Sequence, residues 1–391
     1  MAMEKKIACY VSNTEEAQAY IKKGASDIII SPPQFNIRSM QSPWTSEKHT
    51  LSLLLNIKKN HPKITLWVDI DKTSHPEDMD QIASFIKTLH KHDITHIKSS
   101  DIATLMYCKI NFANNIRWFS PEFGYASSLA IKESKNLAHI THLSNDCPIN
   151  SIQNLNHTNT LSILLLGPIL IQYSKRRYIS YLNQNKQATI HYITDTQHPH
   201  KTCKVYDSPL GHIMFAHFDR CLITEYQQLL NSPIKYLLID SRGESNNYTL
   251  NALKLLNMIS KKTPKAVIKQ QFANFKKSYP RPLCVSYFHQ NNSDHNRHSK
   301  RAILNNKTKI ATVVGLIKPH LIALECLPGC PILNIGDQLY LANPSNKPVI
   351  LTIQTLVDPF LTPLKNSENK QIICINWKKG IESKAWVYLN N

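Results

Sequence analysis

Residues 7–31 read IACYVSNTEEAQAYIKKGASDIIIS, and the first two thirds of the chain repeat the pattern of this stretch. Residues 7–10 form a short apolar run of the kind found in buried strands. Residues 14–23 then place Ala17, Tyr20 and Ile21 on one face of a helix. A second apolar run follows at residues 27–31, so the stretch predicts a strand, a helix and a second strand.

The ends of this expected helix carry residues suited to capping. Asn13 or Thr14 can accept a hydrogen bond from a free amide of the first turn. Gly24 stands just past the last turn, where a left-handed backbone is common. These signals predict a helix that begins near residue 14 and ends near residue 23.

The same alternation continues to about residue 260. A second helix is expected at Met79–His90, where Ile82, Phe85, Ile86 and Leu89 recur at helical spacing. Eight apolar runs are candidate strands: Ile7–Tyr10, Asp27–Ser31, Ile64–Val68, His96–Lys98, Ile116–Phe119, Ala138–Thr141, Ser162–Leu166 and Tyr236–Ile239. Eight strands alternating with helices predict an α/β fold, a (β/α) TIM-like barrel over residues 1–260.

The remaining sequence predicts two further parts. Residues 261–306 contain scattered prolines and a polar stretch rich in Asn, His, Lys and Arg, which indicates a linker with an exposed basic loop. Residues 307–391 have β-branched runs separated by Pro and Gly, which favours a small all-β barrel domain.

The composition indicates a basic protein without a membrane segment. The chain has 46 Lys and Arg against 27 Asp and Glu, a formal charge of +19, which attracts polyanions and makes nucleic acid the first candidate partner. A biased amino-acid usage with solvated charges explains the excess equally well. The longest apolar run, residues 161–171, is interrupted and too short to cross a bilayer. With no secretory segment at the start, the nine cysteines are expected to be reduced thiols in the cytoplasm.

A cationic run with neighbouring tyrosines is the candidate RNA-binding segment. Lys175, Arg176 and Arg177 follow Tyr173, and this combination suits a phosphate backbone with stacked bases. The alternative is a solvated charged face with tyrosines packed into the barrel. Arg242 stands at a predicted strand end beside Asp240, where it can bind an anionic substrate or form a structural ion pair.

Several segments, taken in order, resemble peptidase family U32, the collagenase-like peptidases. They are the first strand–helix unit, FSPEFGYAS at 119–127, ILLLGPILIQYSKRRYISY at 163–181, TCKVYDSPLGHIMFAHFDRCLI at 202–223, IKYLLIDSRGES at 234–245 and ILNIGDQLYLANPSN at 332–346. The matching residues include Tyr173, Ser174, Arg176, Cys203, Tyr206, Asp219, Cys221, Arg242 and Ser245, with Asp240 where the family has Glu. The last segment resembles a hairpin in the C-terminal β-domain of longer members.

The resemblance implies a barrel whose site gathers at the C-terminal strand ends, with Arg242, Asp240 and Glu122 as candidate catalytic residues. It also implies an iron-sulfur cluster on four cysteines, of which Cys203 is the clear survivor. Two family cysteine positions read Leu170 and Arg177 here, and a guanidinium cannot ligate iron. We therefore expect the cluster to be absent or rearranged.

Three functions follow from these expectations. The first is oxygen-independent hydroxylation of tRNA or ribosomal RNA, performed alone or with a partner protein. The second is RNA binding without catalysis. The third is the peptidase activity of the family name, although neither a Gly-x-Ser-x-Gly elbow nor a His-Glu-x-x-His helix is present.

Overall fold

The computed structural model comprises two compact units, Met1–Gln290 and Asn291–Asn391. It describes residues 5–38, 47–122, 126–153, 160–179, 190–195, 198–289, 308–343 and 348–389. Each unit has its own sheet and its own apolar core.

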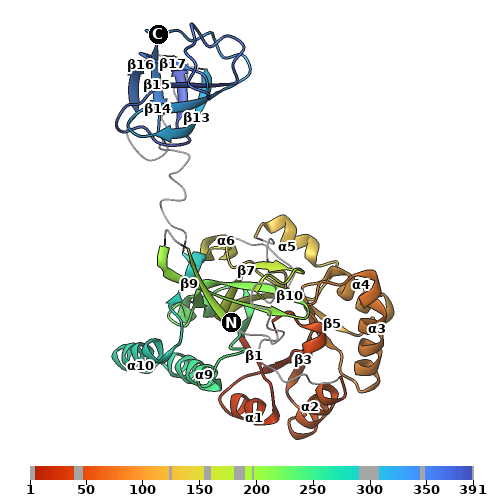
Figure 1. The fold of residues 1–391 in the computed structure, drawn as a ribbon. Helices are drawn as coiled ribbons and strands as arrows, with labels where there is room; N and C mark the ends of the chain where they lie inside the picture. Colours follow the sequence, from red (N-terminus) through yellow and green to blue (C-terminus); the bar gives the residue numbers. More distant parts are fainter. Residues whose placement is uncertain are drawn as a thin grey trace. The chain divides into compact units, whose positions relative to one another are not determined.

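Eight parallel strands form a closed barrel in the first unit (Figure 1). They are β1 (Lys6–Tyr10), β2 (Asp27–Ile30), β3 (Thr65–Asp69), β4 (His96–Ser99), β5 (Ile116–Phe119), β6 (Ile140–His142), β7 (Thr160–Ser174) and β11 (Ile234–Ile239). Each strand pairs with the next, and β11 pairs with both β7 and β1, which closes the ring. The predicted TIM-like barrel and its eight strands are confirmed.

Helices connect and surround the strands. They are α1 (Thr14–Lys22), α2 (Glu47–Asn60), α3 (Pro76–Lys91), α4 (Ile102–Asn111), α5 (Ser128–Ser134), α6 (Ile149–Gln153), α8 (Tyr226–Leu230), α9 (Asn246–Ser260) and α10 (Lys265–Ser278), with short 3-10 turns η1 (Pro33–Phe35) and η2 (Ser286–Phe288). The Asn13 side chain accepts from the Glu16 amide and caps α1, as expected. None of the helices in the described ranges is long and apolar enough to cross a membrane.

The barrel has an inner and an outer apolar core. Inside it, Trp67 and Trp118 lie edge to face with ring centroids 5.1 Å apart, and Tyr236 packs on Trp118 at the same distance. The outer core lies between strands and helices and includes the four apolar residues predicted on α3. Because both faces of each strand are covered, the strands read as continuous apolar runs.

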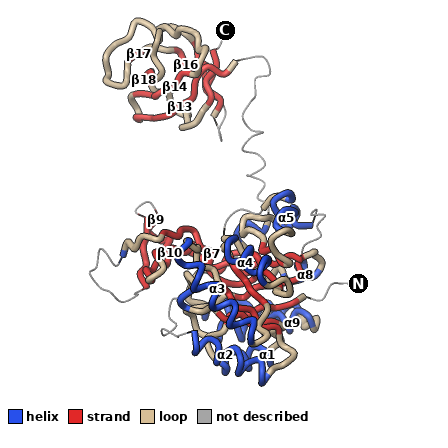
Figure 2. Tube along the Cα trace, turned by 90° about the vertical axis from the view of Figure 1, so that its right-hand side faces the viewer, coloured by secondary structure: helices blue, strands red, loops and turns tan. Residues whose placement is uncertain are grey.

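The connection between β7 and β11 contains an additional antiparallel sheet, although a helix alone could join two neighbouring strands of a (β/α) barrel. β7 continues past the barrel to Ser174 and pairs with β10 (Gly211–Cys221), which pairs with β9 (His198–Ser208) and then β8 (Ile190–Asp195). We call the sheet formed by residues 168–174 of β7 with β8, β9 and β10 the arm (Figure 2). The short strand β12 (Leu283–Cys284) joins β10 in parallel. The sequence pattern does not predict the arm.

The first unit extends beyond residue 260, where the sequence pattern predicts its end. The sequence predicts a linker over residues 261–306. Instead, α10 packs on α9 through the buried side chains of Phe275 and Tyr279. The ring centroid of Tyr279 lies 4.9 Å from that of Tyr248 on α9. The apolar side chains of α10 recur at helical spacing, which gives this segment a face to bury. Residues 290–307 lie outside the described ranges.

The second unit is an antiparallel half-barrel of seven strands, which agrees with the predicted all-β domain. The strands are β13 (Lys309–Ile317), β14 (Leu321–Cys326), β15 (Gln338–Ala342), β16 (Val349–Thr352), β17 (Leu356–Val357), β18 (Ile372–Asn376) and β19 (Trp386–Leu389), in the order β16-β15-β19-β13-β14-β18-β17. Its own apolar core includes Val313, Leu324, Leu339, Ile373 and Val387.

Candidate functional site

The C-terminal ends of the barrel strands carry a dense group of polar and charged side chains. Carboxylates of Asp71, Glu122 and Asp240 meet the cations Arg38, Lys98 and Arg242 around a cavity of about 20 Å³, and the Asp69 carboxylate pairs with Lys98 and Arg242. A cavity of this size holds about one water molecule, so the charged groups largely fill the space themselves. We call this group the mouth cluster.

Arg242 is the most connected cation of the mouth cluster. Its Nε and Nη2 bind the two oxygens of Asp240 at 2.9 and 2.7 Å. Its Nη1 donates to Ser31 at 3.0 Å and to Asn36 at 2.9 Å, and the guanidinium lies 3.7 Å from the ring centroid of Tyr10. A planar fork can satisfy these directions together, which a lysine could not do.

Asp240 is shared between two arginines. Its Oδ2 accepts from Arg242 and also from Arg38 Nη1, at 3.2 Å. Arg38 in turn binds Glu122 through Nη2. The three predicted catalytic residues Arg242, Asp240 and Glu122 therefore lie in one connected network, and Arg38 is the link that the sequence did not reveal.

Electrostatics hold Asp240 ionised. Burial by itself raises the pKa of this carboxyl, but the charge and hydrogen bonds of Arg242, with the charge of Arg38, hold the pKa well below its usual range. Asp240 is thus an anchor for two cations and is poorly suited to exchange protons near neutral pH.

Asp71 is the carboxyl whose pKa approaches neutrality. Burial raises the pKa of Asp71 to about 7, and the negative charge of Asp69 also raises it. The positive charges of Arg242, Lys98 and Arg38 lower the pKa but do not outweigh these two effects. Its Oδ1 accepts from the Ile37 amide at 2.7 Å. A carboxyl that titrates near pH 7 beside a polar cavity is a candidate general acid or base.

Asp69 is held by two strand-end neighbours. Tyr10 donates to its Oδ2 at 2.5 Å, and Lys98 lies 3.1 Å from its Oδ1. Asp69, Asp71 and Lys98 were missed because no motif marks them: Lys98 ends one predicted strand, and Asp69 and Asp71 follow another. Their signal is position: each stands at or just after the end of a barrel strand, where barrel sites gather.

A serine and a histidine lie together below the mouth cluster, on β7 and β6. Ser162 Oγ and His142 Nδ1 are 3.0 Å apart, but Trp118 also donates to Ser162, which is fully buried inside the barrel. Burial, with the charges of Lys98, Arg220 and Arg38, lowers the pKa of His142 well below its usual value. The hydroxyl is inaccessible, so this pair is not arranged as a peptidase nucleophile and base.

The predicted RNA-binding residues lie on the arm, next to the mouth cluster: burial raises the pKa of Tyr173, and the negative charge of Asp71 acts in the same direction. Tyr173 is half-buried and donates to the Leu210 carbonyl at 2.8 Å, so it braces the turn between β9 and β10. Lys175, Arg176 and Arg177 follow the end of β7 and are exposed. Tyr178 is 45% exposed, with its ring 5.1 Å from that of His212.

The cysteines do not supply the ligand set of an iron-sulfur cluster. All nine lie in the described ranges as free thiols, and Cys9, Cys108, Cys147 and Cys221 are buried in the outer core. Cys203 lies half-buried on β9, where burial raises its pKa. Across the described ranges, no three His, Cys, Asp or Glu side chains are grouped to hold a metal. A cluster needs thiolates that converge, so we derive no chemistry through one.

The positions of the missing family cysteines have other roles. Leu170 is buried in a small apolar cluster with Ile37, Tyr206 and Phe215, which attaches the arm to the barrel. Arg177 is exposed on the arm. Asp219, a residue of the resemblance, forms an ion pair with Arg281 at 2.6 Å and accepts from Tyr279 at 3.0 Å, which holds the end of α10 against β10.

Comparison with known proteins identifies the family. The model of peptidase family U32 matches residues 12–298. The C-terminal domain of a putative U32 peptidase from Geobacillus thermoleovorans is similar in structure, with 14% identity over 21% of this chain and 92% of that one, at a TM-score of 0.20. A type I 3-dehydroquinate dehydratase from Clostridium difficile matches with 9% identity over 66% of this chain and 94% of that one, at a TM-score of 0.37. A search of curated proteins finds no match. Because the family model spans most of the sequence, the chain belongs to peptidase family U32.

Proposed function

We propose that this protein binds tRNA or ribosomal RNA through the arm and takes part in the oxygen-independent hydroxylation of that RNA. The observation that carries the proposal is the exposed run Lys175, Arg176 and Arg177 beside half-exposed Tyr178. Cations that contact phosphates and an aromatic ring that stacks on a base are the two elements of single-strand recognition. Family membership and the formal charge of +19 support the same partner.

Two tasks fall to different parts of the first unit. The arm holds the RNA backbone, and the mouth cluster receives a base or another part of the nucleotide. Opening the mouth requires a charged group to move, and Glu122 is suited to this because it is 21% exposed and bound through Arg38. Asp71 then supplies a proton-exchanging group near neutral pH. The redox chemistry is assigned to a partner protein, since no three cysteines of this chain, all within the described ranges, are grouped to hold a cluster.

A binding experiment with matched charge changes tests the RNA partner. The arm variant Lys175→Ala/Arg176→Ala/Arg177→Ala is compared with Lys265→Ala/Lys269→Ala/Lys277→Ala, which removes three exposed charges from α10. Fluorescence anisotropy with labelled tRNA should show a loss of roughly tenfold or more for the arm variant and little change for the α10 variant. Equal losses would contradict a specific role of the arm.

A second experiment separates modification from binding alone. Mass spectrometry of tRNA and ribosomal RNA nucleosides, from cells with and without the gene, should reveal one hydroxylated nucleoside that disappears. Anaerobic purification with iron and sulfide analysis accompanies it, because a cluster found in the purified chain would contradict the partner assignment.

RNA binding without catalysis is the second candidate function, and the filled mouth cluster favours it. Nearly all polar groups around the 20 Å³ cavity are paired within the chain, which leaves little room for a base in the described conformation. This function predicts salt-dependent RNA binding with an unchanged nucleoside profile. Proteolysis is not proposed, because the buried Ser162–His142 pair offers no accessible nucleophile.

A further inference from the structure

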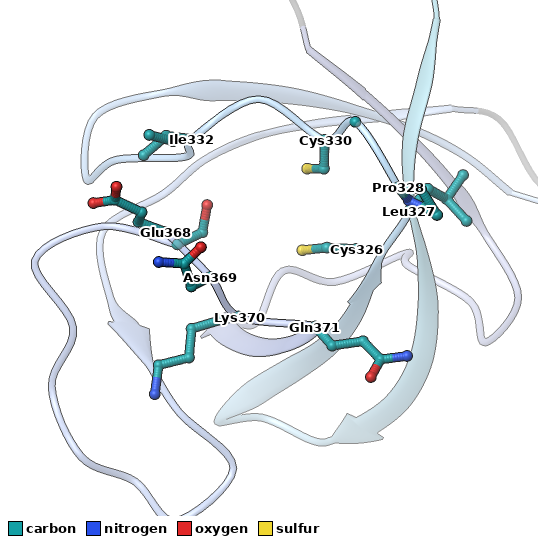
Figure 3. A pocket seen from close by; sticks show the side chains of 11 residues that line it. Cys326, Leu327, Pro328, Cys330, Ile332, Glu368, Asn369, Lys370 and Gln371 are labelled. Carbon is teal, nitrogen blue, oxygen red and sulfur yellow. The ribbon is translucent and has the colours of Figure 1, made fainter.

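Two cysteines face each other across a tight turn in the second unit. β14 ends at Cys326, and the amide of Cys330 donates to the Leu327 carbonyl at 2.9 Å, which closes a β-turn over residues 327–330. Gly329 has a φ of +80°, a conformation that the turn requires and that glycine adopts without strain. Figure 3 shows both sulfur atoms on the same side of this turn. The turn thus brings together two thiols that are four residues apart.

The two thiols line one groove and are close enough to influence each other's pKa. The Cys330 thiol donates to the Pro331 carbonyl at 3.4 Å. Both side chains are partly exposed. The pair therefore differs from the buried core cysteines, because small molecules can reach it.

A groove of about 550 Å³ opens beside the sulfurs. Its far wall is the segment Glu368–Gln371, which contributes the Glu368 carboxylate, the Lys370 ammonium and the amides of Asn369 and Gln371 (Figure 3). These groups can pair with the charged ends and the peptide bonds of a small peptide, so the groove suits a peptide that carries both an ammonium and carboxylates. Its volume is ample for a tripeptide-sized ligand.

We propose that Cys326 and Cys330 form a thiol-modification site that reacts with a small peptide disulfide of the glutathione type and closes to an intramolecular disulfide. In the first step, the thiolate of one of the two cysteines attacks one sulfur of the small disulfide, whose S–S bond breaks and releases one thiolate. In the second step, the thiolate of the other cysteine attacks the protein sulfur of the mixed disulfide, the Cys326–Cys330 bond forms, and a second small thiolate leaves. The two protons of the protein thiols pass to the two leaving thiolates, so the protein is oxidised by two electrons and the small disulfide is reduced.

The pH dependence of the reaction follows from the burial of the two thiols. The thiolate is the nucleophile in disulfide exchange. Burial raises the pKa of Cys326 to about 12 and also raises that of Cys330. The reaction is therefore slow at neutral pH and accelerates as the pH rises.

The test uses the reduced full-length chain and oxidised glutathione. Samples are quenched by alkylation at intervals and mapped by mass spectrometry of peptides. The wild type should accumulate a Cys326–Cys330 disulfide that dithiothreitol reverses. Cys326→Ser should trap one glutathione on Cys330, and Cys330→Ser should trap one on Cys326, because each variant lacks the thiol that would resolve the mixed disulfide.

The exposed Cys284 of the first unit provides the internal comparison. As a single thiol it should gain glutathione without forming a protein disulfide, and Cys284→Ser should leave the reaction of the pair unchanged. The proposal is overturned if the wild type forms no Cys326–Cys330 disulfide while Cys284 is modified. Near-ultraviolet circular dichroism confirms that each variant is folded.

Discussion

Asp240 holds two buried guanidinium groups at the mouth of the barrel, so removal of its charge has a large expected effect. In Asp240→Asn, Arg242 and Arg38 lose their shared counter-ion while both stay largely buried. Breaking a buried ion pair from one side costs about 3–5 kcal/mol of unfolding free energy. Urea denaturation of the first unit measures this loss.

The matched control for Asp240→Asn is Asp93→Asn. Asp93 is almost fully exposed and lies 4.0 Å from Lys58 on the surface. Its replacement should leave the denaturation midpoint unchanged, because exposed ion pairs contribute little. A similar shift in both variants would mean that the mouth cluster does not depend on Asp240.

The titration of Asp71 should make the free energy of unfolding depend on pH, with a sign that follows from its raised pKa. Its pKa is about 7 in the folded state and near 4 when the chain is unfolded, so between these values the folded state binds the extra proton. The unfolding free energy contributed by Asp71 therefore falls as the pH rises from about 4 to 7, by at most about 1.4 kcal/mol per pH unit.

Denaturation of the wild type and Asp71→Asn at several pH values tests this sign. Asparagine can still accept from the Ile37 amide, so the comparison isolates the titration. The wild type should gain stability relative to Asp71→Asn as the pH is lowered from about 7 to about 5. A difference that stays constant with pH would show that Asp71 is ionised throughout.

Strand β7 serves both the barrel and the arm, and Gly167 marks the change between them. Its φ is +149°, and a Cβ atom there would lie 2.5 Å from the Asp240 carbonyl oxygen. Gly167→Ala should therefore displace the strand end that carries Asp240 and destabilise the first unit by roughly 1–3 kcal/mol. Thermal unfolding followed by circular dichroism measures the change.

Gly336 in the second unit provides a control for Gly167→Ala, because a side chain at Gly336 would meet backbone strain without a close contact to another residue. It has a φ of +100°, and a Cβ atom there would meet nothing within 4 Å. Gly336→Ala carries the conformational penalty alone, so its effect should be smaller than that of Gly167→Ala. The reverse order would contradict the importance of the close approach to Asp240.

The net charge of the whole molecule predicts strong salt dependence of RNA binding. The logarithm of the RNA-binding constant falls linearly with the logarithm of the salt concentration. Each phosphate that the protein no longer neutralises reduces the magnitude of this negative slope by about 0.7 to 0.9. For the arm variant Lys175→Ala/Arg176→Ala/Arg177→Ala, the magnitude of the slope should therefore be smaller than for the wild type by about 2 to 3. The α10 variant should keep the wild-type slope, and an equal reduction would indicate that the charge acts as a diffuse field.

Much of the architecture could be predicted from local pattern. The eight strands, the α1 cap at Asn13 and the buried face of α3 follow from apolar runs and helical spacing, which involve neighbours in sequence. The arm was missed because Gly167-Pro168 reads as a turn that ends the strand, whereas β7 continues through both residues. Helix α10 was missed because the prolines near it suggested a linker.

The sequence by itself determined the barrel, the β-domain and the identity of the residues at the strand ends. Only the tertiary structure decided which of these residues meet. Arg38 contacts Asp240 across 202 positions and Glu122 across 84, and the same fold places Lys175, Arg176 and Arg177 on a separate arm. The reason is physical: helical and strand periodicity depends on adjacent residues, whereas contacts at the mouth depend on the closure of a ring of strands distant in the chain.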